Sequence, residues 1–184
     1  MKRSFQHGFP LFKSEAENHE QHKTKILTDV LAMPRHGIKE NGIRLTSCDW
    51  AMNEDVPRHY WDAGYKAVES LIKQVCDLLG FSNWKVLERW FQYYEQGDYH
   101  TWHIHGNAMF VGVYYVKLED SNPVLTFKWR EQDIEVPVSE GDVLMFPSYL
   151  WHKAKKTTGS SKLILSFNCN FSVGQDAERL FNKV

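Results

Sequence analysis

WKVLERWFQYY (residues 84–94) opens a series of short β-rich runs, which continues with MFVGVYYVKL (109–118), VLTFKW (124–129), DIEVPV (133–138), DVLMF (142–146), WHKAKK (151–156) and KLILSFNCNFSV (162–173). Gly, Pro, Asn, Asp and Ser separate the runs, as they do in turns between strands. The pattern predicts seven or eight closely spaced strands. Such a series is typical of a β-sandwich or a β-barrel.

No helix-sized segment interrupts these runs, which argues against parallel βαβ winding. The architecture that fits best is mainly β, a double-stranded β-helix of the jelly-roll or cupin-like kind. In the last run apolar and polar residues alternate, so one face is apolar and the other mostly polar. We expect the apolar face to lie under a helix and the polar face, with Lys162, Ser166 and Asn168, to line a cavity.

The helix that would cover this sheet lies upstream. From Asp55 to Leu79 apolar residues recur every three or four positions, and Gly80 follows where a helix end belongs. The tail DAERLFNK (176–183) could add a last helical turn. We expect one domain over residues 1–184: an N-terminal extension packed on the core (1–54), the supporting helix (55–80) and the double-stranded β-helix (84–171).

Composition excludes several classes of protein. The formal net charge of -1 gives no reason to expect a nucleic-acid partner. Three widely spaced cysteines (Cys48, Cys76 and Cys169) argue against a disulfide scaffold or a zinc ribbon and favour a cytoplasmic location. No apolar run suits a signal peptide or a membrane span, so we expect no membrane partner. The sequence is compatible with an oligomer.

Three histidines have the spacing of a metal site. His103 and His105 lie two residues apart in GDYHTWHIHGN (97–107), so on an extended chain both imidazoles share a face. This pair alone could equally be packed aromatic rings. In SEGDVLMFPSYLWHKA (139–154) a Gly-Asp turn opens a strand, Pro147 ends it and His152 begins the next one. We expect these three to bind one metal, while His100 should point to the opposite face of its strand.

The arrangement resembles the two cupin motifs: Gly97 followed by His103 and His105, then Gly141, Pro147 and His152. Tyr149 replaces a usual glycine, and no glutamate follows His105 where four-ligand cupins have one. Three protein ligands would leave two or three positions open on a metal that prefers five or six. The missing glutamate therefore favours an oxygenase over a storage-type cupin. Neutral imidazoles suit Fe, Cu, Ni and Zn alike, so ligand type alone does not select Fe(II).

The segment from Trp90 to Phe171 is also similar to a family of small bacterial and phage-encoded 2-oxoglutarate- and Fe(II)-dependent oxygenases. The strings that carry the resemblance are GDYHTWHIHGN, VGVYYV (111–116), MFPSYLWH (145–152) and KLILSFN (162–168). The resemblance implies Fe(II) and 2-oxoglutarate as cofactors, His103, His105 and His152 as the catalytic metal ligands, and hydroxylation of a small molecule or a protein side chain. The cofactors would do the oxidation.

Two residues depart from this family on the last strand. Lys162 stands where the family uses an arginine to hold the far carboxylate of 2-oxoglutarate, and Ile164 replaces a serine. Lysine still neutralises a carboxylate, but as a point charge without a bidentate fork. Ser166, Asn168, Tyr94 and Tyr115 could supply the hydrogen bonds to the co-substrate.

Three hypotheses for the function follow. The first is an Fe(II)- and 2-oxoglutarate-dependent dioxygenase. The second is a three-histidine cupin dioxygenase that binds its organic substrate directly on the metal, as thiol dioxygenases do, without 2-oxoglutarate. The third is a non-enzymatic cupin-like module that binds a sugar or a partner protein.

Overall fold

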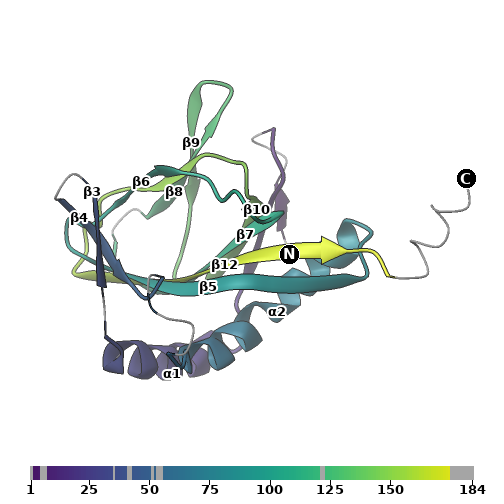
Figure 1. Ribbon diagram of the computed structural model, residues 1–184. Coiled ribbons are helices and arrows are strands. Elements are labelled where there is room, and N and C mark those ends of the chain that lie inside the picture. The colour runs from purple at the N-terminus through teal and green to yellow at the C-terminus, as the bar shows by residue number, and fades with distance from the viewer. Residues whose placement is uncertain are drawn as a thin grey trace, which may run out of the picture.

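The computed structural model describes residues 2–4, 8–34, 36–40, 43–50, 52, 56–120 and 123–174, in which the strands form two antiparallel sheets (Figure 1). The larger sheet has the strand order β1 (Lys2–Ser4), β2 (Leu11–Glu15), β10 (Asp142–Pro147), β7 (Phe110–Leu118), β12 (Ser161–Ser172), β5 (Asn83–Glu95), β4 (Ile43–Cys48) and β3 (His36–Glu40). The smaller sheet has the order β6 (His100–His103), β11 (His152–Ala154), β8 (Val124–Trp129) and β9 (Gln132–Pro137).

The two helices of the described ranges, α1 (His19–Ala32) and α2 (Tyr60–Leu78), pack on the larger sheet. Figure 1 shows them on the side of β5 and β12 that faces away from β6, β8 and β9. The predicted mainly β architecture with a helical layer on one sheet is therefore confirmed. Neither helix is long and apolar enough to cross a membrane.

Strand β12 separates two hydrophobic cores. Its apolar residues pack in the first core with the buried face of α2: Leu163, Leu165, Phe167, Cys169 and Phe171. Its alternate residues face a cavity between the sheets: Lys162, Ile164, Ser166 and Asn168. The second core lies between the two sheets beside this cavity and includes Phe127, Phe146 and Ile164. The predicted division of β12 into a helix-facing side and a cavity side is thus confirmed.

Helix α2 ends as its sequence predicts. Gly80 has a positive φ of 78°, which glycine adopts at little cost. The Gly80 N–H donates to the carbonyl of Asp77, and the Phe81 N–H donates to the carbonyl of Cys76. These two bonds form a Schellman motif, which satisfies carbonyls that have no partner within the helix.

The start of α2 differs from the prediction. Asp55, the expected first residue, lies outside the described residues, and α2 begins at Tyr60 after non-helical residues 56–59. Pro57 explains part of the delay, because the residue before a proline is disfavoured in the helical region. The predicted helical turn at 176–183 also lies outside the described residues.

Asp49 ties this helix start to the large sheet, and its side chain is fully buried. One carboxylate oxygen accepts hydrogen bonds from Arg58 Nε at 2.9 Å and from the Tyr60 hydroxyl at 2.6 Å. The other accepts from the Phe91 N–H of β5 at 2.8 Å. A buried carboxylate is tolerated when it is paired and hydrogen-bonded in this way. Burial and the neighbouring Asp49 charge raise the pKa of Tyr60, so its hydroxyl stays a donor.

The first 54 residues do more than cover the core. β2 pairs with β10 and β4 pairs with β5, so this segment extends the large sheet at both edges. The expected packed-on extension is therefore partly a set of sheet strands.

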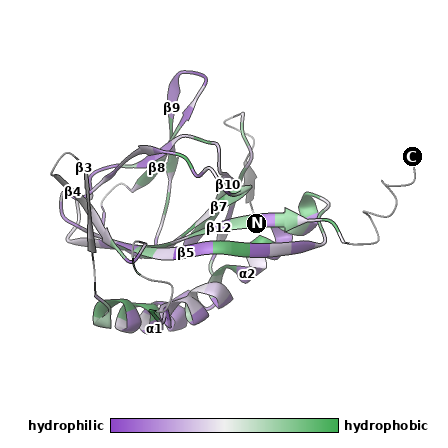
Figure 2. Cartoon of the chain, in the orientation of Figure 1, coloured by the Kyte–Doolittle hydropathy of each residue, from purple (hydrophilic) through white to green (hydrophobic). Residues whose placement is uncertain are grey.

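On the side of the molecule away from α1 and α2, the β8–β9 hairpin projects outwards and is coloured mostly hydrophilic in Figure 2.

Candidate metal centre

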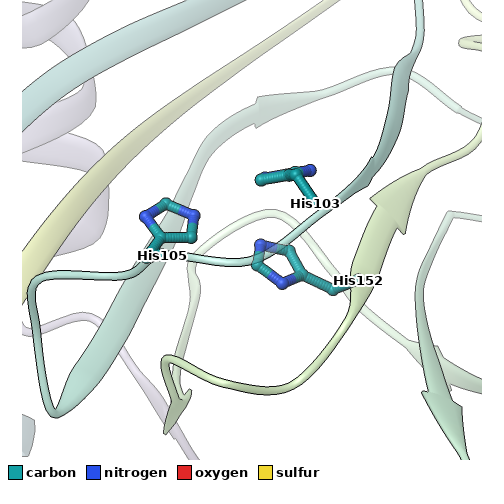
Figure 3. Close-up of side chains that lie close together, drawn as sticks. All are labelled: His103, His105 and His152. Carbon is teal, nitrogen blue, oxygen red and sulfur yellow. The ribbon is translucent and has the colours of Figure 1, made fainter.

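The smaller sheet brings the three histidines together. β6 and β11 pair antiparallel, with His103 opposite His152, and His105 follows two residues after the end of β6. The His105 N–H donates to the carbonyl of Ser148 at 3.0 Å, which fixes this segment beside the loop before β11. Figure 3 shows the three rings gathered around one space.

The ring distances allow one shared ion. Ring centroids lie 4.2 Å apart for His103 and His152, and 5.3 Å apart both for His103 and His105 and for His105 and His152. One nitrogen from each ring lies within 4.8 Å of the others, close enough for a single metal ion. The described residues therefore place the three predicted ligands in one cluster.

Hydrogen bonds of the Nδ1 atoms leave the Nε2 atoms available. His103 Nδ1 lies 2.8 Å from the Thr101 carbonyl oxygen, and His152 Nδ1 lies 2.8 Å from that of Leu150. A carbonyl only accepts, so in both rings Nδ1 carries the proton and Nε2 keeps a free lone pair. Metal-binding histidines are commonly oriented by a partner on the other ring nitrogen.

The electrostatics of the cluster fit a cation. Burial lowers the pKa of His103, of His105 (to about 4) and of His152, which keeps the rings neutral near pH 7. Neutral imidazole is the form that binds a metal. His105 Nε2 is buried without a hydrogen-bond partner, which is unusual unless a ligand or an ion satisfies it. The donor set thus fits a divalent metal.

The fourth imidazole near the cluster is His100, and its predicted orientation is wrong. It does not point away from the other rings: it lines the same cavity, and its ring stacks on His103 with centroids 4.0 Å apart. The cause is an irregularity in the β6–β11 register, where His103 pairs with His152 but His100 pairs with Ala154. Between these two pairs, Thr101 and Trp102 of β6 lie opposite Lys153 of β11, as in a β-bulge, and this returns His100 to the side of His103.

All the predicted site residues line one cavity of about 460 Å³ between the sheets. β6, the segment after it and β11 contribute His103, His105 and His152, and the larger sheet contributes Tyr94, Tyr115, Lys162, Ser166 and Asn168. Apolar side chains such as Val113, Leu125 and Ile164 form much of the remaining wall. The cavity therefore combines a histidine cluster, one buried cation and apolar walls, as small-molecule sites often do.

Lys162 is the buried cation. Its side chain is 6% exposed, and Nζ lies 4.0 Å from the centroid of the Tyr94 ring. Burial lowers its pKa to about 8, so it remains mostly charged at pH 7. Burial also raises the pKa of Tyr94 and of Tyr115, which therefore remain neutral donors. An enclosed ammonium group in a cavity that two tyrosines also line suits an anionic ligand.

Comparison with known proteins identifies the fold. No family model matches the sequence, and no curated protein is significantly similar to it. Solved structures do match. A 2OG-Fe(II) oxygenase family protein from Burkholderia pseudomallei aligns with a TM-score of 0.69 and 10% identity over 86% of this chain and 84% of its own. A Pseudomonas putida prolyl-4-hydroxylase aligns with a TM-score of 0.65 and 16% identity over 92% of this chain and 96% of its own. The chain has the fold of the 2OG-Fe(II) oxygenases.

A third structure with this oxygenase fold is described with ligands. HygX from Streptomyces hygroscopicus, solved with nickel and 2-oxoglutarate bound, aligns with a TM-score of 0.63 and 12% identity over 86% of this chain and 82% of its own. At these identities the likeness shows the fold, which confirms the predicted double-stranded β-helix.

Sequence reasoning missed a row of residues on the oxygenase fold's β5. Glu88, Trp90, Gln92 and Tyr94 alternate along this strand and line the cavity, but only Tyr94 was predicted. Trp90 stacks on His105 with ring centroids 5.7 Å apart, and Gln92 Nε2 lies 3.0 Å from His100 Nδ1. Their period-two spacing could have revealed them.

A second cluster of possible metal ligands, one histidine and two glutamates, lies outside the cavity of the oxygenase fold. His19, Glu20 and Glu140 also bring three possible ligand atoms within 4.8 Å of one another. However, the Lys23 ammonium pairs with a carboxylate oxygen of Glu140, and His19 Nδ1 lies 2.8 Å from the Tyr114 hydroxyl. These contacts join α1 to β7 and to the turn before β10.

Proposed function

We propose that this protein is an Fe(II)- and 2-oxoglutarate-dependent dioxygenase that hydroxylates a small molecule or a protein side chain. The observation that carries the proposal is that three neutral imidazoles and one buried lysine meet in a single cavity. His103, His105 and His152 would hold the iron. The histidines would suit other divalent metals too, and the fold of the matching oxygenases favours iron.

Lys162 would bind the far carboxylate of 2-oxoglutarate, with hydrogen bonds from Tyr94, Tyr115 and Ser166. With iron and 2-oxoglutarate bound, the chemistry supplied would be hydroxylation of a substrate C–H bond by O₂, with conversion of 2-oxoglutarate to succinate and CO₂. The protein's own part is to hold the metal on three sides, orient the co-substrate through a buried charge and keep water out with apolar walls.

The partner would be a small molecule or a side chain that reaches the cavity. The Trichoplax adhaerens prolyl hydroxylase, solved with a hypoxia inducible factor peptide fragment, aligns with a TM-score of 0.63 and 15% identity over 95% of this chain and 87% of its own. A peptide side chain is thus one of the two substrate classes that we propose for this protein. We also propose that the protein is a single domain. We propose a cytoplasmic location, because the three buried cysteines form no disulfide among the described residues.

The test of the proposed function is formation of succinate. The protein with Fe(II), 2-oxoglutarate and O₂ should produce succinate, and the same mixture with His103→Ala should produce none above background. No iron-dependent succinate from the wild-type protein would contradict the proposal.

Two observations favour a second candidate, the three-histidine dioxygenase that does not use 2-oxoglutarate. His105 stands where the usual iron triad of two histidines and one carboxylate has its carboxylate. Ile164 puts an apolar group on the cavity wall where the 2-oxoglutarate-dependent family has a serine. Iron-dependent O₂ uptake that requires a thiol or another chelating substrate, but not 2-oxoglutarate, would select this candidate.

Lys162→Met should weaken 2-oxoglutarate binding by about 10- to 100-fold, because a hydrogen bond to a charged group is worth roughly 1.5–3 kcal/mol. Calorimetric titration of the metal-loaded protein measures the change. Lys153→Met removes a lysine that pairs with Asp133 instead and serves as the matched control. If both variants bind 2-oxoglutarate as the wild type does, Lys162 does not hold the carboxylate.

Binding of 2-oxoglutarate should also depend on pH through Lys162. Its lowered pKa of about 8 means that the ammonium form, which attracts the carboxylate, is depleted as pH rises through this value. Affinity should therefore fall between about pH 7 and pH 9 in the wild-type protein, and this fall should be absent in Lys162→Met. A wild-type affinity that stays constant over this range would argue against the assignment.

A further inference from the structure

The third ring of the cluster is held differently from the other two. Backbone carbonyls accept from Nδ1 of His103 and His152, and a carbonyl cannot act as a donor. His105 Nδ1 instead lies 2.9 Å from the side-chain oxygen of Asn168. An amide can present either its oxygen or its NH₂ group to a neighbour. The proton on His105 is therefore fixed only if the amide of Asn168 is fixed.

Glu88 fixes that amide. Asn168 Nδ2 donates to Glu88 Oε2 at 2.5 Å, and the two residues are direct cross-strand partners of β12 and β5. A carboxylate only accepts hydrogen bonds, so the NH₂ group of Asn168 must face Glu88. Its oxygen must then face His105. Nδ1 of His105 consequently carries the proton, and Nε2, which is buried without a hydrogen-bond partner, keeps its lone pair for a metal.

We propose that Glu88 is a positioning residue that sets, through Asn168, the tautomer in which His105 can bind a metal. The inference rests on the proposed metal centre but adds to it, because Glu88 does not belong to the clustered imidazoles. Asn168 is almost fully buried, whereas Glu88 lies exposed at the cavity mouth. Substitution of Glu88 should therefore leave the core intact.

Two variants test the direction of the hydrogen bonds. Glu88→Lys replaces the acceptor with a donor-only group, so the Asn168 amide should turn its oxygen to the lysine and its NH₂ group to His105. His105 would then carry its proton on Nε2 and could not bind. Adding Asn168→Asp restores the relay, because a carboxylate at residue 168 accepts from both Lys and His105. Glu69→Lys, on the exposed surface of α2, is the matched control for the added charge.

The first measurement needs no metal. Two-bond ¹H–¹⁵N spectra of the apo-protein with labelled histidine report which ring nitrogen is protonated. We expect His105 to be the Nδ1–H tautomer in the wild type, in the Glu69→Lys control and in the double variant, and the Nε2–H tautomer in Glu88→Lys. A charge effect on the site would not change the tautomer.

The second measurement is titration with Co²⁺. Glu88→Lys should lower affinity by about 10- to 100-fold, as loss of an outer partner of a metal-binding histidine typically does, and Asn168→Asp should restore it. A wild-type tautomer in Glu88→Lys, or a double variant no better than the single one, would overturn the role of Glu88. Absence of Co²⁺ binding by the wild type would instead overturn the metal centre, whatever the spectra show.

Discussion

Replacing His152 with alanine is expected to abolish metal binding, with a loss of affinity of at least about 100-fold. Outer partners of metal-binding histidines alone are worth about 10- to 100-fold, and this change removes a ligand itself. His152 is 4% exposed, and its ring lies nearest to that of His103 within the cluster. The two remaining imidazoles would have to hold the ion without the strand that faces them.

The measurement is a Co²⁺ or Fe(II) titration of the purified variant under anaerobic conditions. His22→Ala provides the control, because His22 lies on α1 outside the cavity. Thermal unfolding of both apo-proteins would show that the fold is retained. Equal affinity of His152→Ala and the wild type would mean that the cluster does not bind the metal.

Asp49→Ala should destabilise the protein by about 3–5 kcal/mol, since removal of one partner of a buried ion pair leaves the other charge uncompensated. The change would remove the hydrogen-bond acceptor of three donors. These are Arg58 Nε and the Tyr60 hydroxyl near the start of α2 and the Phe91 N–H on β5. The free energy of unfolding in urea measures the effect. Such a loss is a large fraction of the stability of a typical domain.

Asp77→Ala is the matched control for Asp49→Ala. Asp77 pairs with Lys73 on the exposed side of α2, and an exposed pair contributes little to stability. We therefore expect the control to unfold at nearly the wild-type urea concentration. Similar stability of the two variants would show that Asp49 does not hold the helix to the sheet.

Features set by local rules could be predicted from the sequence. The alternation in β12 predicted which residues face α2 and which face the cavity, because side chains of a strand alternate between faces. Gly80 predicted the end of α2, because a left-handed residue there closes the helix. The turns at Gly97 and Gly141, each with a φ of 88°, have the positive φ that glycine favours.

Features set by distant contacts could not be predicted. The returned position of His100 depends on how β6 aligns with β11, about fifty residues away, and a one-residue change of register reverses the face of a strand residue. Glu88 was missed because its role depends on the pairing of β5 with β12. Asp49 was missed for the same reason, since its partners come from α2 and β5.

The most direct test of the proposed function is an anaerobic titration of the protein with Fe(II) and then with 2-oxoglutarate, followed by visible absorption. If the three histidines and Lys162 form one site, a charge-transfer band should develop when 2-oxoglutarate is added to the iron-loaded protein. It should be absent in His103→Ala and weaker in Lys162→Met at the same 2-oxoglutarate concentration. Iron binding without any such band in the wild-type protein would contradict 2-oxoglutarate as the co-substrate.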